Sequence, residues 1–327
     1  MTILKKITNV SFPEFLLLTL IISFIIVIFK NFYNNFSKKE GFIERKLDFI
    51  KKTDKDVYDD FYVDIYDDLV YNNVKNNYEI DRIFKSDTPN KQHKILDIGC
   101  STGHHVYLLN NNNNNNDNND NDDNDNDDNV IGIDNSPSMI KKAKKNYPDL
   151  HFKLCDALNS MAFPADTFTH ITCLYYTIYY MKNKKLFLDN CFNWLQPGGV
   201  LILHLVDMHK FDPIIPIATS IPYNNDSHKV RNTESIVKFD TLDYKSNFNI
   251  DKSIDANSIN LDKPNAVFKE TIKLKNPKSV RINDHNLYMS TQNSILALAR
   301  EIGFSMQSVN EMSDIGYDHN FLYVLQK

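Results

Sequence analysis

Short apolar runs and helical patterns alternate along this 327-residue chain from residue 94 onward. Strands that alternate with helices are typical of a parallel sheet covered by helices on both faces. The pattern therefore predicts an α/β fold. The expected strands are residues 94–98, 130–133, 152–154, 170–176, 200–206, 305–309 and 321–325.

Helix boundaries in this region carry clear signals. A helix is expected to begin after Gly103, and Ser136 followed by Pro137 predicts an N-cap and a first-turn proline. Thr291 is expected to cap the last helix, and Gly303 is expected to end it.

Glycine is scarce, with 8 residues in the whole chain. A chain so poor in glycine should keep it where the backbone geometry requires it. Most of these glycines lie at the ends of predicted strands or helices. They are Gly99, Gly103, Gly132, Gly198, Gly199 and Gly303.

Three aspartates end three successive predicted strands. Asp97 precedes a glycine turn, Asp134 ends the second strand, and Asp156 follows the third. Because the carboxyl ends of parallel strands share one edge of a sheet, we expect these side chains to converge on one crevice. Asp134 is placed to accept hydrogen bonds from a ribose diol, and Asp156 from an adenine amino group.

These segments resemble class I S-adenosylmethionine-dependent methyltransferases. The run ILDIGCSTG (95–103) is similar to the first motif of the family, IGID (131–134) to its acidic ribose motif, and Cys155-Asp156-Ala157 to its adenine motif. Residues 168–175 and 195–203 resemble later motifs, so the resemblance covers about residues 90–207 and 291–327. Ser101 departs from the pattern because it replaces the middle glycine.

The resemblance implies a seven-stranded, mostly parallel Rossmann-like sheet with an antiparallel last strand. The alternative is a nicotinamide-binding fold, which needs G-x-G-x-x-G. Ser101 and His104 occupy two of those three glycine positions, and Asp156 with the Pro-Gly-Gly at 197–199 favours the methyl donor.

By this resemblance, S-adenosylmethionine is the expected co-substrate, and its binding residues lie at the strand ends and in the glycine turn. His104 is expected near the carboxylate of the donor. The predicted donor-binding residues are Tyr66, Asp97, Gly99, Cys100, Ser101, Gly103, His104, Asp134, Asn135, Asp156, Ala157 and Leu174.

Four residues at the ends of the fourth and fifth strands are candidates for catalysis. They are Tyr175, Tyr176, His204 and Asp207. A general base is needed only if the acceptor must lose a proton, and His204 also fits a hydrogen-bonded core histidine. No metal is expected, because His204 and Asp207 fall on opposite faces of a strand.

Two further segments are expected over the same crevice. Residues 57–92 form a predicted helical cap, in which Tyr66 is a lid candidate, and residues 208–290 form a predicted antiparallel insertion. Related small-molecule methyltransferases place such segments over the donor and around the acceptor. The candidate pocket residues are Arg281, His285, Tyr288 and Met289.

The amino-terminal region predicts a single-pass membrane anchor at residues 12–33, after a short tail at 1–11. Residues 15–29 carry no charge, which favours a span over an amphipathic core helix. No small-residue cleavage site of a signal peptide follows. Basic residues are more numerous after this segment than before it, which places the enzyme domain in the cytosol.

The rest of the chain divides into a linker at 34–56, the cap, a methyltransferase core at 93–207, the insertion, and a C-terminal part of the core at 291–327. Residues 110–129 contain only 13 Asn and 7 Asp. Such a tract cannot pack, so it is expected to loop out into solvent as a disordered insertion.

The net charge bears on nucleic-acid binding, and the cysteine content bears on the redox compartment. The net charge is −5, and removing the seven tract aspartates gives −5 + 7 = +2. The rest of the chain is thus not basic enough to indicate a nucleic-acid-binding protein. The four cysteines lack a C-x-x-C pair and fit free thiols in a reducing compartment.

Together these features predict a membrane-anchored methyltransferase that acts on a small-molecule or lipid acceptor at the bilayer surface. Two alternatives stay open. One is a donor-binding membrane scaffold without catalysis, and the other is a protein methyltransferase.

Overall fold

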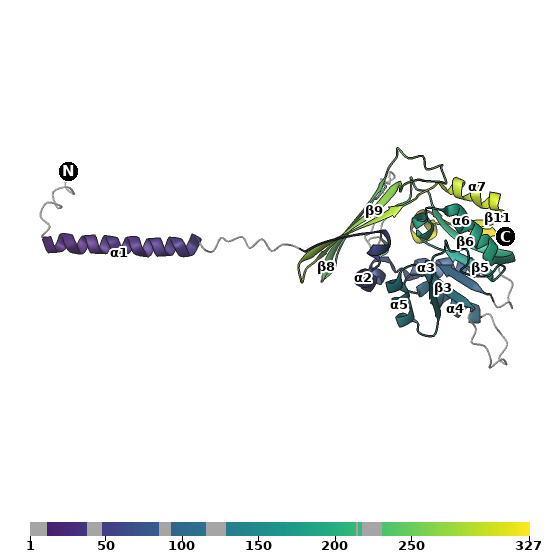
Figure 1. Cartoon of the computed structure of the whole chain (residues 1–327), viewed down its shortest axis with the longest axis horizontal. Helices are drawn as coiled ribbons and strands as arrows, with labels where there is room; N and C mark the ends of the chain where they lie inside the picture. The colour runs from purple at the N-terminus through teal and green to yellow at the C-terminus, as the bar shows by residue number, and fades with distance from the viewer. Residues whose placement is uncertain (1–11, 38–47, 85–92, 116–128, 214, 218–230) are drawn as a thin grey trace. The chain divides into compact units, whose positions relative to one another are not determined.

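The structure is a computed structural model that describes residues 12–37, 48–84, 93–115, 129–213, 215–217 and 231–327. The chain divides into two compact units, Met1–Leu47 and Asp48–Lys327. The described part of the first unit is the helix α1 (Phe12–Ser37). The described part of the second unit contains every strand in Figure 1.

The membrane anchor predicted at residues 12–33 is not supported. A helix does form there, and the side chains of residues 21–30 are exposed on it. Among the described residues, however, no helix combines the length and the apolar character needed to cross a membrane.

The second unit is built on a seven-stranded sheet. Its order is β11-β12-β6-β5-β2-β3-β4. Neighbouring strands from β6 to β4 are parallel, whereas β12 runs antiparallel to both β6 and β11. The strands are β2 (Ile95–Ile98), β3 (Val130–Asp134), β4 (His151–Leu154), β5 (Phe168–Cys173), β6 (Leu195–Val206), β11 (Ser305–Met312) and β12 (Tyr317–Gln326). The mostly parallel α/β sheet is thus confirmed.

Helices cover both faces of this sheet, and each face has its own core. On one face α6 (Lys184–Trp194) and α7 (Gln292–Ile302) pack against Leu96 and Leu203. On the other, α4 (His104–Asn115) and α5 (Pro137–Asn146) pack against Ile95. Alternate strand residues face opposite sides, so a short buried strand serves both cores.

The predicted caps are confirmed. The Ser136 side chain accepts from the Met139 backbone, the Thr291 side chain accepts from the Ser294 backbone, and Gly303 ends α7 at a φ of 126°. These side chains satisfy backbone donors that a helix start leaves free.

A second sheet of five strands has the order β1-β10-β9-β8-β7. Its antiparallel part comes from the predicted insertion and consists of β7 (Glu234–Lys238), β8 (Leu242–Ile250), β9 (Ala266–Leu274) and β10 (Ser279–Leu287). The fifth strand, β1 (Asp48–Thr53), pairs parallel to β10. Residues 48–53 are therefore not the linker that the sequence predicted, and the described residues hold more strands than expected.

The cap between the two sheets consists of two helices. After the 3-10 turn η2 (Asp54–Val57), α2 (Asp60–Val70) packs its Tyr62 and Leu69 against Tyr244 and Ile272 of the second sheet. The helix α3 (Asn73–Phe84) instead packs its Ile80 and Ile83 on the first sheet. The rest of the predicted cap, residues 85–92, lies outside the described residues.

The Asn/Asp tract begins inside a helix. The helix α4 extends to Asn115, and the buried Asn113 side chain accepts from the His93 backbone N–H at 3.1 Å and donates to the His93 carbonyl at 2.9 Å. The prediction that the whole tract loops out is wrong for residues 110–115, since an asparagine can satisfy a neighbouring chain segment in both directions. Residues 116–128 lie outside the described part of the chain.

Candidate active site

The turn after β2 is shaped by three residues with positive φ. The φ angles are 77° at Gly99, 49° at Ser101 and 95° at Gly103. A Cβ added at Gly99 would lie 2.6 Å from Thr177 Cγ2, so this position has no room for a side chain. Ser101 takes the left-handed conformation despite its Cβ, at a strain cost of about 1–2 kcal/mol. The departure from the family motif therefore leaves the backbone path of a glycine turn in place.

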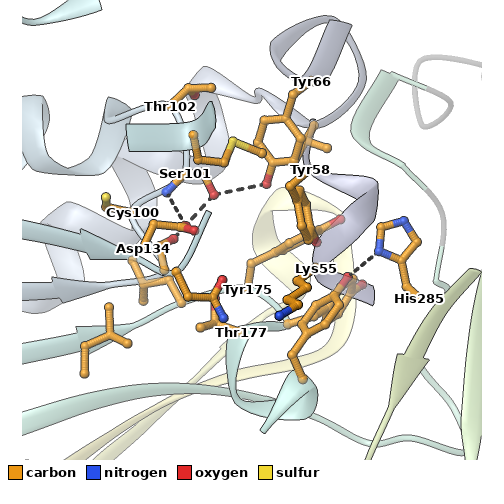
Figure 2. A pocket seen from close by; sticks show the side chains of 18 of the residues that line it. Lys55, Tyr58, Tyr66, Cys100, Ser101, Thr102, Asp134, Tyr175, Thr177 and His285 are labelled. Atoms are coloured by element: carbon orange, nitrogen blue, oxygen red, sulfur yellow. Dashed lines mark hydrogen bonds between the residues drawn. The ribbon is translucent and has the colours of Figure 1, made fainter. Parts of the chain in front are cut away.

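Asp134, at the end of β3, closes this turn. Its carboxylate accepts from the Ser101 N–H at 3.1 Å and from the Ser136 N–H at 2.9 Å, as Figure 2 shows for Ser101. Burial raises the pKa of Asp134 to about 6, although these backbone hydrogen bonds favour the charged form. The turn at residues 99–103, the donor turn, thus holds the Asp134 carboxylate through the Ser101 backbone.

The other two strand-end aspartates differ in environment. Asp97 is buried, its Oδ1 accepts from Thr172 Oγ1 at 2.7 Å, and burial raises its pKa. Asp156 is exposed and accepts from the Leu158 N–H at 2.9 Å. All three carboxylates line the same cavity, whose volume is about 590 Å³, as the convergence of parallel strand ends predicts.

Tyrosines dominate the wall of this cavity. The cap supplies four of them, the segment after β5 supplies three, and the residue after β10 supplies one. They are Tyr58, Tyr62, Tyr66, Tyr71, Tyr175, Tyr176, Tyr180 and Tyr288. Figure 2 shows Tyr58, Tyr66 and Tyr175 around the space in front of Asp134.

The cap helix is bonded directly to the donor turn. The Tyr66 hydroxyl lies 3.3 Å from Ser101 Oγ. Asp67 accepts from Thr102 Oγ1 at 2.6 Å, and its other oxygen lies 3.1 Å from His104 Nε2. This placement agrees with the lid position predicted for Tyr66.

A buried ionic cluster beside the turn was missed from the sequence. Glu79 of α3 accepts from Lys75 Nζ at 2.8 Å and lies 2.8 Å from His105 Nε2. Burial raises the pKa of Glu79, but the Lys75 charge and the His105 hydrogen bond outweigh burial and hold the pKa well below its ordinary value. Lys75 and His105 line the cavity. The i,i+4 spacing of Lys75 and Glu79 was the available signal in the sequence, but such pairs are also common on solvent-exposed helices.

Eleven of the twelve predicted donor-binding residues line the cavity. They are Tyr66, Asp97, Gly99, Cys100, Ser101, His104, Asp134, Asn135, Asp156, Ala157 and Leu174. Gly103 does not line it. Gly103 instead lies directly before α4, at a point where a Cβ would lie 2.8 Å from the Phe152 ring.

The four predicted catalytic residues separate into two pairs. Tyr175 and Tyr176 line the cavity, with their rings 4.1 Å apart. His204 does not line it, because its ring is fully buried between the Tyr175 N–H at 3.1 Å and Asn320 Oδ1 at 3.1 Å. The structure therefore corrects the catalytic assignment of His204. The His204 ring instead accepts a hydrogen bond from the backbone N–H of Tyr175, a residue whose φ is 53°.

Asp207 also lies away from the cavity lining. Its Oδ1 accepts from the His209 N–H at 3.1 Å, and its Oδ2 pairs with Lys210 at 3.4 Å, so it closes a turn after β6. Among the described residues, no group of three His, Cys, Asp or Glu side chains could hold a metal ion.

The predicted acceptor-side residues also separate. His285 and Tyr288 line the cavity. Met289 belongs to the hydrophobic core, and Arg281 is turned to Asp59, which it bonds through Nη1 at 2.9 Å to both oxygens. Arg281 thus has a structural role in the second sheet, and Met289 has one in the core beside the first sheet.

Comparison with known proteins identifies the central segment. Residues 89–236 match a methyltransferase domain. A curated relative, trans-aconitate 2-methyltransferase of Delftia acidovorans, is 23% identical over 113 residues, which are 35% of this chain and 38% of that protein. The match therefore spans less than two thirds of the length of the relative.

Solved structures share the fold over about four fifths of this chain. An S-adenosylmethionine-dependent methyltransferase from Clostridium acetobutylicum is 14% identical, with a TM-score of 0.56 over 81% of this chain and 97% of that one. The CcbJ methyltransferase of Streptomyces caelestis is 12% identical, with a TM-score of 0.56 over 83% and 98%. The SAM-bound amino pentose methyltransferase CalS10 of Micromonospora echinaspora is 15% identical, with a TM-score of 0.50 over 78% and 91%. These likenesses confirm the expected methyltransferase fold.

Proposed function

We propose that this chain transfers a methyl group from S-adenosylmethionine to a small-molecule acceptor. One observation carries the proposal. A single cavity is lined by the three strand-end carboxylates of the methyltransferase domain and by polar groups of the second sheet, so donor and acceptor can meet in one space.

The residues at the strand ends fit the donor. Asp134 offers a carboxylate to the two ribose hydroxyls, and Asp156 offers one to the adenine amino group. Lys75 supplies a positive group for the carboxylate of the methionine part, whereas both ring nitrogens of His104 are engaged by Tyr147 and Asp67. Because Gly99 has no side chain, the donor can approach the backbone closely at this position. The bound donor supplies a methyl group already activated on a sulfonium.

The acceptor half of the cavity supports a small molecule. Its wall is formed by α2, the turn η3 (Thr177–Tyr180) and the second sheet, which contribute the aromatic rings of Tyr62, Tyr66, Tyr180 and Phe268. A volume of about 590 Å³ is in the range of small-molecule and cofactor sites. The lipid acceptor and the membrane surface depended on the anchor, so they are not part of this proposal.

Calorimetry with S-adenosylmethionine and the full chain tests the donor half. Asp134→Ala is expected to weaken binding by about 1–3 kcal/mol, because a charge-assisted acceptor is lost. Asp149→Ala is the matched control, since Asp149 is exposed and outside the cavity lining. Equal affinities of Asp134→Ala and the unmodified chain would contradict the ribose assignment.

Product analysis separates catalysis from simple binding. Release of S-adenosylhomocysteine together with a methylated small molecule from a cell extract supports the proposal. Donor binding without any release would favour the scaffold alternative. Methylation confined to the protein fraction would favour a protein methyltransferase.

A further inference from the structure

A buried carboxylate stands on the acceptor side of the cavity. Glu270 of β9 is 1% exposed and accepts four hydrogen bonds. The donors are Tyr62 Oη at 2.8 Å, Tyr244 Oη at 2.7 Å, Asn283 Nδ2 at 2.9 Å and His285 Nε2 at 2.9 Å. Burial raises the pKa of Glu270, but His285 and the hydrogen bonds from Asn283 and Tyr244 outweigh burial, so the pKa lies below its ordinary value. Glu270 is therefore an anion at neutral pH.

This anion fixes the tautomer of His285. A carboxylate only accepts hydrogen bonds, so His285 Nε2 must carry the hydrogen in their 2.9 Å contact. In the neutral ring, Nδ1 is then an acceptor. It lies 3.0 Å from the Tyr180 hydroxyl, which donates to it, and Figure 2 shows this bond at His285.

Glu270, His285 and Tyr180 form a continuous chain, and all three line the cavity. The order carboxylate, imidazole, hydroxyl is the arrangement that lets a histidine draw a proton from a hydroxyl group. The ring of His285 also lies 5.7 Å from Tyr58, 6.1 Å from Tyr62 and 5.8 Å from Phe268, measured between ring centroids. Aromatic faces and a carboxylate together stabilise an imidazolium.

Other charged groups lie on the elements that pack against His285, and Lys55 of η2 also lines the cavity (Figure 2). On β10, Arg281 bonds Asp59, and Asp284 pairs with Lys51 at 2.9 Å. From η2, Asp54 accepts from the Asn286 side chain. The titratable groups that face His285 directly are Glu270 from β9, Tyr180 from η3, and Tyr58 and Tyr62 from the cap.

We propose that Tyr180 and His285 form a proton relay, positioned by Glu270, for an acceptor that loses a proton from oxygen or nitrogen on methylation. This inference rests on the proposed function and narrows its substrate class to hydroxyl and amine compounds. Tyr180 is the catalytic residue that touches the acceptor, and Glu270 is a positioning residue.

The step balances with groups already present. The acceptor oxygen or nitrogen forms a bond to the methyl carbon, and the carbon–sulfur bond breaks with its electron pair left on sulfur. The acceptor proton passes to the Tyr180 oxygen as the Tyr180 proton passes to His285 Nδ1. The resulting imidazolium stays paired with Glu270 until solvent takes the proton.

The substrate class is tested with matched compounds and S-adenosylmethionine. One set is phenethyl alcohol, phenethylamine and methyl phenethyl sulfide; the other is glucose, glucosamine and a methylthio-hexose. The relay predicts product from the alcohols or amines and none from the sulfides, which have no proton to lose. Transfer only to the sulfides, or to no compound while the donor binds, would overturn the relay.

Two variants test the residues with the compound that is methylated. His285→Gln keeps an N–H toward Glu270 but has no basic nitrogen, and Tyr180→Phe loses only the hydroxyl. Each is expected to lower kcat about 100-fold with KM and donor affinity nearly unchanged. The controls are His209→Gln and Tyr107→Phe, which lie outside the cavity lining.

The tautomer gives a readout that needs no turnover. In the full chain labelled with ¹⁵N-histidine, His285 is expected to show a protonated Nε2 and an unprotonated Nδ1, with the Nδ1 resonance shifted in Tyr180→Phe. The opposite tautomer, or wild-type rates in both variants, would refute the relay. If the unmodified chain does not bind S-adenosylmethionine in calorimetry, the proposed function is refuted instead. The two failures are therefore distinguishable.

Discussion

Asp134 combines a raised pKa with a position at the donor turn, which links donor binding to pH. Its pKa of about 6 lies above the ordinary value of 3.8 because of burial. The folded protein therefore binds more protons than the unfolded chain between these values. In this window the Asp134 contribution to the free energy of unfolding falls as pH rises.

Donor affinity should follow the opposite trend. Only the ionised carboxylate can accept from both ribose hydroxyls, so the affinity for S-adenosylmethionine is expected to fall by up to about tenfold for each pH unit below about 6. Calorimetry across that range measures it. Asp134→Asn should bind more weakly and lose this dependence; an unchanged slope in Asp134→Asn would show that another group controls it.

Single residues also show where sequence reasoning stops. The strand-end aspartates were found because parallel topology alone brings them to one edge. His204 was misplaced because its ring partners are the Tyr175 backbone and Asn320, 116 positions away. A sequence shows that a histidine lies at a strand end, but not whether both of its nitrogens are already bonded.

At the scale of elements, α3 contains a buried ion pair between its own Lys75 and Glu79. Glu79→Gln would leave the Lys75 ammonium buried without its anion, so the free energy of unfolding is expected to fall by about 3–5 kcal/mol. Urea denaturation measures the loss. Glu301→Gln, at an exposed position of α7, is the control and should change stability by less than about 0.5 kcal/mol.

The end of α4 gives a second prediction at this scale. Asn113→Ala removes both side-chain hydrogen bonds to the His93 backbone, which should cost about 2 kcal/mol. Thermal or urea unfolding measures this. Asn111→Ala, on a partly exposed position of the same helix, should have little effect; equal losses in both variants would indicate helix propensity instead.

Elements of the first sheet were predictable because short apolar runs between turn residues are a strong local signal. The strand β1 was not, since DFIKKT has neither alternation nor an apolar run, and its burial pattern is mostly exposed. Its structure comes from pairing with β10, a long-range contact with no local trace in the sequence. The helical start of the tract was missed for a similar reason, because one buried asparagine cannot be told from its neighbours.

At the scale of the whole second unit, Arg281 joins the second sheet to the cap. Its Nη1 bonds both oxygens of Asp59, the N-cap of α2, and its Nη2 donates to the Val57 carbonyl at 2.7 Å. Arg281→Met should lower the free energy of unfolding by about 3 kcal/mol, because the buried end of the cap loses its partner.

The cap covers the donor turn, so the same variant should also weaken donor binding. Lys51→Met is the matched control, because its pair with Asp284 is exposed on the lysine side and should contribute less than about 1 kcal/mol. Urea unfolding and calorimetry give the two readouts. Equal effects of the two variants would mean that the Arg281 contact does not hold the cap.

Because β1 pairs with β10, the second sheet cannot be completed during translation until β10 has been synthesised. Asp48 pairs with Ser279 and Thr53 with Asp284, so β1 emerges early and waits for a partner that is translated near the end of the chain. Closing so long a loop is slow. The second sheet can therefore close only after residue 287 has emerged, and the first sheet is completed later still, when β12 (Tyr317–Gln326) pairs with β6.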